Sequence, residues 1–195
     1  MRHILITTAA LVALLLAGCA LSPQQVEIQP KPEVDSANLG HNQPVKVIAV
    51  DARAQQAFGS RGGVYANSAT ITPANNVGQA IAESVRQSLQ AMGFNAYNPG
   101  DDATTLEVRL EKLDYSVEQD SVVNKVTLSL VMDAIGKRGD VTHTGTYKSS
   151  VSHSSPFTPS QAKNREMIND ILSQAIQHML SDPKMIAFLT GNDTP

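Results

Sequence analysis

Three stretches in which polar and apolar residues alternate lie between residues 104 and 153, and they constrain the fold more than any other feature. The first alternates from Leu106 to Leu110, changes phase at Glu111 and alternates again as far as Val117. The others run from Val126 to Ala134 and, with many Thr and Ser residues, from Val141 to His153. A period of two is typical of a strand with one buried and one wet face. The pattern predicts three long antiparallel strands, with a β-bulge at the change of phase.

Two other segments carry apolar residues at three- and four-residue steps, which is typical of amphipathic helices. One runs from Val77 to Met92, after an Asn pair that can cap it and before Gly93. The other begins at residues 158–160 and ends before Asp182 and Pro183. A last helical turn over residues 185–189 is expected to fold back on the core.

Two shorter strands, Val45 to Val50 and a weaker one from Val64 to Thr72, precede the first helix. The order of strands, helix, strands and helix predicts an α+β fold, with an antiparallel-rich sheet and two amphipathic helices packed on one face. The opposite face is expected to be wet unless a partner covers it. It would carry Glu107, Arg109, Glu111, Lys125, Thr127 and Ser129.

The N-terminus has the features of a signal peptide. A basic start, Met1 to His3, precedes a mostly apolar run from Ile4 to Leu16 that is shorter than the ~20 residues needed to span a bilayer. Leu16, Ala17 and Gly18 then precede Cys19, which is the one cysteine of the chain. Residues 1–18 are therefore predicted to be a signal peptide, with Leu16, Ala17 and Gly18 as the recognition site for its cleavage.

The four residues that end at Cys19 resemble the lipobox of bacterial lipoproteins. The resemblance implies that the Cys19 sulfur receives a diacylglycerol and that the new amino group is acylated after cleavage. The protein would then be attached to a membrane through its N-terminal lipid. Ala20, where an Asp would favour retention in the inner membrane, implies the outer membrane with the domain in the periplasm. The alternatives are an ordinary secreted protein with a chance cysteine, or an uncleaved signal anchor.

Residues 19–44 follow the signal peptide and contain four prolines, at positions 23, 30, 32 and 44. Proline removes amide donors and disfavours helix in the preceding residue. We therefore expect a lipidated cysteine and an extended tether, followed by a single periplasmic domain over residues 45–190 and a frayed tail over residues 191–195. The alternative is that Val26 to Ile28 adds an edge strand to the domain.

The whole layout resembles the YajG-like family of bacterial outer-membrane lipoproteins. The resemblance rests on the lipobox, the strand from Val45, the helix before Gly93 and Phe94, the three long strands, and a C-terminal helix followed by Phe188. It implies an outer-membrane lipoprotein without an assigned biochemical activity. It supplies no catalytic motif.

Residues that could carry chemistry do not form a recognisable set. His143 and His153 are ten residues apart on one predicted strand, hence ~33 Å apart and too distant to share a metal ion. Asp101 and Asp102 follow a turn sequence, and the serines around His153 lack a visible acid and oxyanion hole. We therefore expect no catalytic residue, no metal and no cofactor. A net charge of −3 gives no reason to expect nucleic-acid binding.

Three functions are compatible with this sequence. The first is a non-enzymatic, lipid-anchored accessory or binding module, which would contact an envelope protein through the wet sheet face or the loop over residues 51–64. The second is a carrier that holds an apolar, lipid-like ligand between the sheet and the helices. The third, which the sequence favours least, is an envelope hydrolase.

Overall fold

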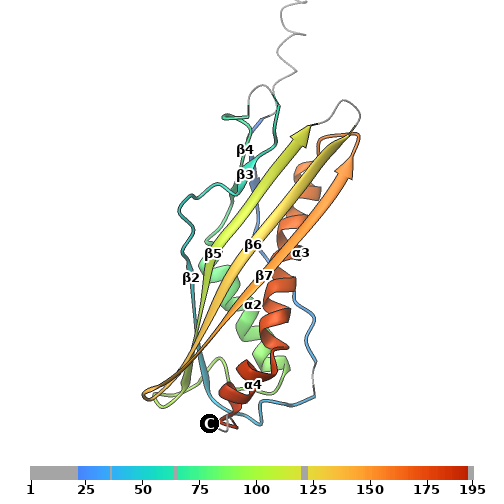
Figure 1. The fold of residues 1–195 in the computed structure, drawn as a ribbon. Coiled ribbons are helices and arrows are strands. Elements are labelled where there is room, and N and C mark those ends of the chain that lie inside the picture. The colour runs from blue at the N-terminus through green and yellow to red at the C-terminus, as the bar shows by residue number, and fades with distance from the viewer. Residues whose placement is uncertain (1–21, 36, 64–65, 120–122, 193–195) are drawn as a thin grey trace, which may run out of the picture.

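The computed structural model describes residues 22–35, 37–63, 66–119 and 123–192, which form a sheet covered by helices on one side (Figure 1). Its strands are β1 (Gln24–Val26), β2 (Val45–Asp51), β3 (Gly59–Ser60), β4 (Thr70–Pro73), β5 (Thr104–Gln119), β6 (Asn124–Arg138) and β7 (Val141–Ser155). Its helices are α2 (Val77–Ala91), α3 (Gln161–Leu180) and α4 (Pro183–Thr190). No helix among the described residues is both long and apolar enough to cross a membrane.

The three alternating stretches form β5, β6 and β7, which pair antiparallel in chain order. A turn at Gly139 and Asp140 joins β6 to β7, and Gly139 adopts the left-handed conformation with φ of 56°. The pairing of β5 with β6 shifts between Leu110 and Lys112. This shift confirms the bulge predicted from the change of phase at Glu111, because an extra residue moves the apolar positions back to the buried face.

The sheet as a whole is mixed, so the expectation of an antiparallel-rich sheet is only partly correct. β2 pairs with β5 in parallel, β1 pairs with β4 in parallel, and β3 is antiparallel to β4 and parallel to β5. Parallel neighbours need a long crossover connection, and α2 lies in the connection from β2 to β5. Alternation reports which face of a strand is buried but not the direction of its neighbour, and the sequence pattern therefore did not reveal this topology.

All three described helices lie against the same face of the sheet, as predicted for the first two (Figure 1). Asn76 caps α2 by accepting a hydrogen bond from the Gln79 amide at 2.9 Å. Ser160 and Asp182 cap α3 and α4 in the same way. Gly93, with φ of 88°, ends α2 where an L side chain would be strained.

The core between the sheet and the helices is closed. Leu110 on β5, Leu128 on β6 and Ile176 on α3 have exposed fractions of 0%. A side chain with no accessible surface borders neither solvent nor an internal void that could hold a water molecule. The apolar positions of β5 and β6 therefore pack directly against the apolar stripes of the helices. Most inward-facing residues of β7 are only half-buried.

The predicted tether is contradicted over residues 24–31, where an edge strand forms as the alternative suggested, although this strand, β1, spans Gln24–Val26 and not Val26 to Ile28. β1 pairs with β4, and Ile28 is only 2% exposed. The Ile28 amide donates to Asn75 Oδ1 at 2.8 Å, and the Gln29 amide donates to Asn169 Oδ1 at 2.6 Å. The chain from Gln24 to Lys31 therefore belongs to the domain, held by side chains of α3 and of the residues before α2.

Candidate functional site

The sheet face opposite the helices has no covering layer in the part of the chain that the structure describes (Figure 1). It is formed by β2, β5, β6 and β7, whose alternate side chains point away from the core. We call this surface the outer face. It carries the six polar residues predicted for the wet side of the sheet, and all of them keep some exposed surface.

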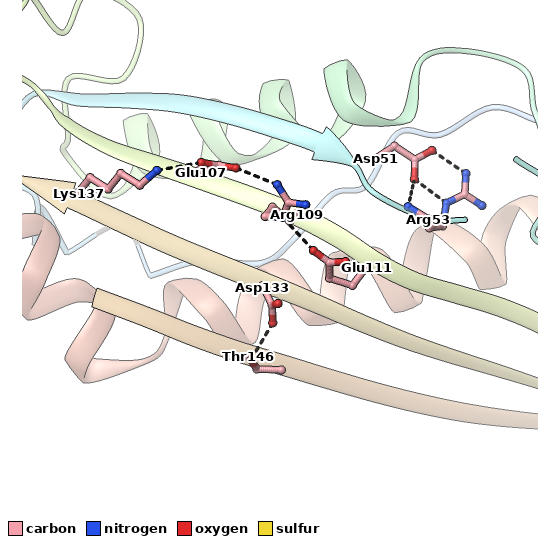
Figure 2. Close-up of polar contacts among 8 residues, drawn as sticks. All are labelled: Asp51, Arg53, Glu107, Arg109, Glu111, Asp133, Lys137 and Thr146. Atoms are coloured by element: carbon pink, nitrogen blue, oxygen red, sulfur yellow. Dashed lines mark hydrogen bonds and ion pairs between the residues drawn. The ribbon is translucent and has the colours of Figure 1, made fainter. Parts of the chain in front are cut away.

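A row of ion pairs runs across the outer face (Figure 2). Lys137 Nζ lies 3.3 Å from Glu107 Oε2, and Arg109 Nη1 lies 3.2 Å from Glu107 Oε1. Arg109 Nε also lies 2.9 Å from Glu111 Oε1. Hydrogen bonds from Arg109 and then from Lys137 lower the pKa of Glu107 below its ordinary value. The outer face is therefore polar but internally neutralised.

Apolar side chains stand beside this row. On β2, Ile48 is 40% exposed and Val50 is 37% exposed. Ile48 is in register with Glu107, and Val50 is in register with Arg109. The outer face therefore presents neutralised charges and exposed aliphatic groups side by side.

The edge of β5 beside this face is interrupted. β2 leaves β5 at Leu110, whose carbonyl accepts a hydrogen bond from the Ala52 amide at 3.0 Å. The chain returns at Phe58, whose carbonyl accepts from the Tyr115 amide at 2.7 Å. Gly59 fixes the return, because an added Cβ there would lie 1.9 Å from the Tyr115 carbonyl oxygen. Between these two points the loop over residues 52–58 arches away from β5.

A cleft of about 490 Å³ lies between this loop and β5, and we call it the edge cleft. Its lining includes Arg53 and Phe58 from the loop, and Leu113 and Tyr115 from the strand. Tyr115 directs its amide to Phe58, and residues two apart in a strand direct their main-chain groups to the same side. The amide and carbonyl of Leu113 therefore point into the cleft, where no strand of the described part of the chain pairs with β5.

Arg53 is the most unusual residue of the cleft. Its Nε and Nη2 each donate to an oxygen of Asp51 at 2.7 Å, and its guanidinium carbon lies 4.4 Å from the centre of the Phe58 ring (Figure 2 shows the pair with Asp51). The side chain is only 4% exposed, yet its Nη1 has no hydrogen-bond partner among the residues that the structure describes. An unpaired buried donor is costly, by roughly 1–3 kcal/mol. The site therefore holds a rigid donor that lacks an acceptor.

The charges around the edge cleft are balanced. Three carboxylates each lie within ion-pair distance of one cation: Asp51 with Arg53, Glu111 with Arg109, and Asp114 with Lys112 at 2.9 Å. No net charge remains to attract a strongly anionic or cationic ligand. The arrangement instead presents neutral main-chain groups and one unsatisfied N–H donor.

The residues predicted for lipidation and cleavage, Leu16 to Cys19, lie outside the described residues. The other candidates do not converge. His143 stacks on Phe188 at 5.8 Å, whereas His153 lies near the opposite end of β7. Asp101 and Asp102 are exposed in their turn. Among the described residues, no group of three or more His, Cys, Asp or Glu side chains is placed to hold a metal ion.

The sequence indicated the loop over residues 51–64 as a contact region but did not identify Arg53. An Arg two residues after an Asp is not a distinctive pattern in a polar loop. Its burial depends on Phe58 and on the arch fixed by Gly59. The glycine at position 59 was the available signal, because it marks a close approach of two backbones.

Comparison with known proteins gives a family and a fold. A family model described as an uncharacterized lipoprotein matches residues 30–190. No curated protein matches the chain. A solved structure of an uncharacterized protein is 12% identical, with a TM-score of 0.50, and covers 80% of this chain and 97% of its own. Protein XCC0632 from Xanthomonas campestris, of family DUF330, is 13% identical, with a TM-score of 0.48, and covers 83% of this chain and 92% of its own.

Proposed function

Because the chain belongs to the YajG family of uncharacterized lipoproteins, we propose that it is a non-enzymatic, lipid-anchored binding module of the outer membrane. Cys19 would carry the lipid, and the domain would face the periplasm. The lipobox from Leu16 to Cys19 and the Ala at position 20 support this placement. The scattered positions of the histidines and paired carboxylates give no support to a hydrolase.

The edge cleft is the proposed binding site, and its ligand is an extended, uncharged segment of an envelope protein. The observation that carries this proposal is the buried Nη1 of Arg53, which lacks an acceptor beside an unpaired stretch of strand edge. A peptide in extended conformation would pair with the main chain of Leu113, as in strand addition. One of its carbonyl oxygens would accept a hydrogen bond from Arg53.

The charge balance favours a peptide main chain over an anionic ligand. Asp51 already neutralises Arg53 through two bonds of 2.7 Å. A phosphate or carboxylate in the cleft would also face the carboxylates of Glu111 and Asp114. The exposed Ile48 and Val50 on the neighbouring outer face would add apolar contact to the same partner.

A carrier of apolar ligands is less well supported. Such a ligand would have to lie between the sheet and the helices, where Val108, Met132 and Leu172 have exposed fractions of 0%. A lipid chain would have to separate the two layers, at the cost of their apolar contacts. The surface clefts offer a site without that disruption.

Selection from a phage-displayed library of random heptapeptides against the lipidated protein in detergent tests the proposed site. We expect uncharged, β-branched sequences to be enriched on the wild type and lost on Arg53→Gln and on Ala57→Trp, which fills the edge cleft. Ala74→Trp is the matched control, because it fills a different cleft, of about 530 Å³, between β1 and α3. Equal enrichment on Ala57→Trp and Ala74→Trp would refute the site.

Attachment through Cys19 is tested separately. The Cys19→Ala protein should be recovered in the soluble periplasmic fraction with its circular dichroism unchanged, whereas the wild type should fractionate with the outer membrane. Recovery of Cys19→Ala with the membrane, after its signal has been removed, would contradict the lipid anchor.

A further inference from the structure

We propose that the end of the sheet nearest Cys19 rests on the lipid bilayer, with Phe157 and Val123 in contact with lipid. The proposal rests on the lipidation of Cys19 proposed above. Its partner is a lipid surface: the described chain begins at this end of the sheet, and exposed apolar side chains lie there.

The described part of the chain begins at Ser22, beside the far end of β5. Arg61 Nη1 donates to the Ser22 carbonyl at 3.0 Å. An added Cβ on the next residue, Gly62, would lie 3.2 Å from Val117 and 3.5 Å from Gln119, the last residue of β5. Ser22 follows Cys19 by three residue steps, which span at most about 11 Å even when fully extended. A lipid on Cys19 would therefore bring this end of the sheet to the membrane surface.

The same end carries the most exposed aromatic ring of the described chain. Gln119 pairs with Asn124, and Asn124 pairs with Ser155, so the ends of β5, β6 and β7 are in register. Val123 and Phe157 lie just beyond them, with exposed fractions of 39% and 78%. The other three phenylalanines, Phe58, Phe94 and Phe188, are 2% exposed or less. An exposed ring beside a lipid attachment point is suited to the interface of a bilayer.

Exposure alone does not indicate contact with lipid, because Val141 at the other end of β7 is also 53% exposed. Val141 and Ser155 are the first and last residues of β7, and fourteen steps of ~3.3 Å place them about 46 Å apart. Only the end with Phe157 lies within reach of Cys19. The two ends of one strand thus provide a contact position and its internal control.

This seating would orient the proposed binding site. With the ends of β5 and β7 at the bilayer, the long strands would lead away from the membrane (Figure 1). Leu113, in the edge cleft, is six residues before Gln119, hence about 20 Å from the membrane-facing end. The cleft and the outer face would remain open to a partner in the periplasm.

The absence of tryptophan from the sequence makes a direct test possible. Full-length lipidated Phe157→Trp and Val141→Trp proteins would be reconstituted in vesicles of phosphatidylethanolamine and phosphatidylglycerol, with and without brominated phospholipid. We expect the tryptophan of Phe157→Trp to emit at shorter wavelength and to lose most of its emission to the brominated lipid. The tryptophan of Val141→Trp should keep the emission of an exposed ring.

Each outcome decides the proposal. If both variants sediment with the vesicles but the Phe157→Trp protein is not quenched, the proposed contact of Phe157 with lipid is wrong, while attachment through Cys19 still holds. Equal quenching of both variants would overturn the orientation. Failure of the lipidated protein to sediment would overturn the anchor of the proposed function, and the seating with it.

Discussion

The two faces of the long strands are built from alternating residues of the same segments, yet they differ in burial and in polarity. On β6, Leu130 is 1% exposed against the helices, whereas its neighbour Val131 lies half-buried on the outer face. On β5 and β6 the inner face is mostly buried and apolar, whereas the outer face carries neutralised charges with aliphatic groups among them. We therefore expect the inner face to determine stability, whereas the outer face is free for the partner proposed above.

The different contributions of the two faces to stability can be tested by truncating neighbouring residues on the two faces of β6. Leu130→Ala removes a fully packed side chain and should lower the free energy of unfolding by about 2–5 kcal/mol. Val131→Ala should lower it by less than about 1 kcal/mol, because the removed methyl groups are partly in water already. Urea unfolding of the Cys19→Ala protein, followed by circular dichroism, measures both. Similar losses would mean that the outer face is also a packed interface in the free protein.

A second, smaller effect concerns the polar network that ties β1 to the inner face. Tyr115 donates to Asn164 Oδ1 at 2.9 Å, and Asn164 Nδ2 donates to Gln24 Oε1 at 2.7 Å. Asn164 has an exposed fraction of 0%. Asn164→Ala would leave both partners unpaired and should lower the free energy of unfolding by about 1–3 kcal/mol. Tyr115→Phe should lower the free energy of unfolding by less in the Asn164→Ala protein than in the wild type, and a double-mutant cycle would measure this difference.

The same network predicts a dependence on alkaline pH. Burial raises the pKa of Tyr115 from 10.0 to about 12. The folded state therefore holds the phenol proton more tightly than the unfolded state, and stability falls as the pH rises from about 10 towards about 12. Chemical unfolding at a series of pH values should show a shallower fall for Tyr115→Phe than for the wild type. Parallel curves would show that Tyr115 ionises freely in the folded protein.

The sequence revealed the two faces of the long strands because alternation is a local property. The apolar positions from Leu106 to Leu110 and from Val126 to Ala134 are buried as their pattern predicts, and the bulge at Glu111 followed from the same pattern. The helices were equally visible, because their apolar spacing and their caps at Asn76 and Ser160 are also local.

Contacts between distant segments could not be predicted in this way. The chain from Gln24 to Lys31 contains one proline, lies between two more and looks like a tether. Asn169 and Ser173 of α3, more than 130 residues later, nevertheless accept hydrogen bonds from its amides. Arg53 likewise lies in a loop of ordinary composition, and its burial arises only when Gly59 docks against Tyr115. Neither the edge strand β1 nor the edge cleft has a periodic signal.

The smallest expected effect on stability lies in the ion pairs of the outer face. Glu107 accepts hydrogen bonds from Arg109 and Lys137, and these bonds lower its pKa. The ionised Glu107 therefore stabilises the folded state above the ordinary glutamate pKa, and this contribution is lost as the pH falls through the lowered pKa. At neutral pH, Glu107→Gln should cost less than about 1 kcal/mol, because ion pairs on a surface gain little over water. The free energy of unfolding of the wild type and of Glu107→Gln should be measured at neutral pH and in acid, and the difference between the two proteins should disappear in acid. A large loss at neutral pH would mean that the ion pairs hold the sheet together, in which case the outer face would share the structural role of the inner one.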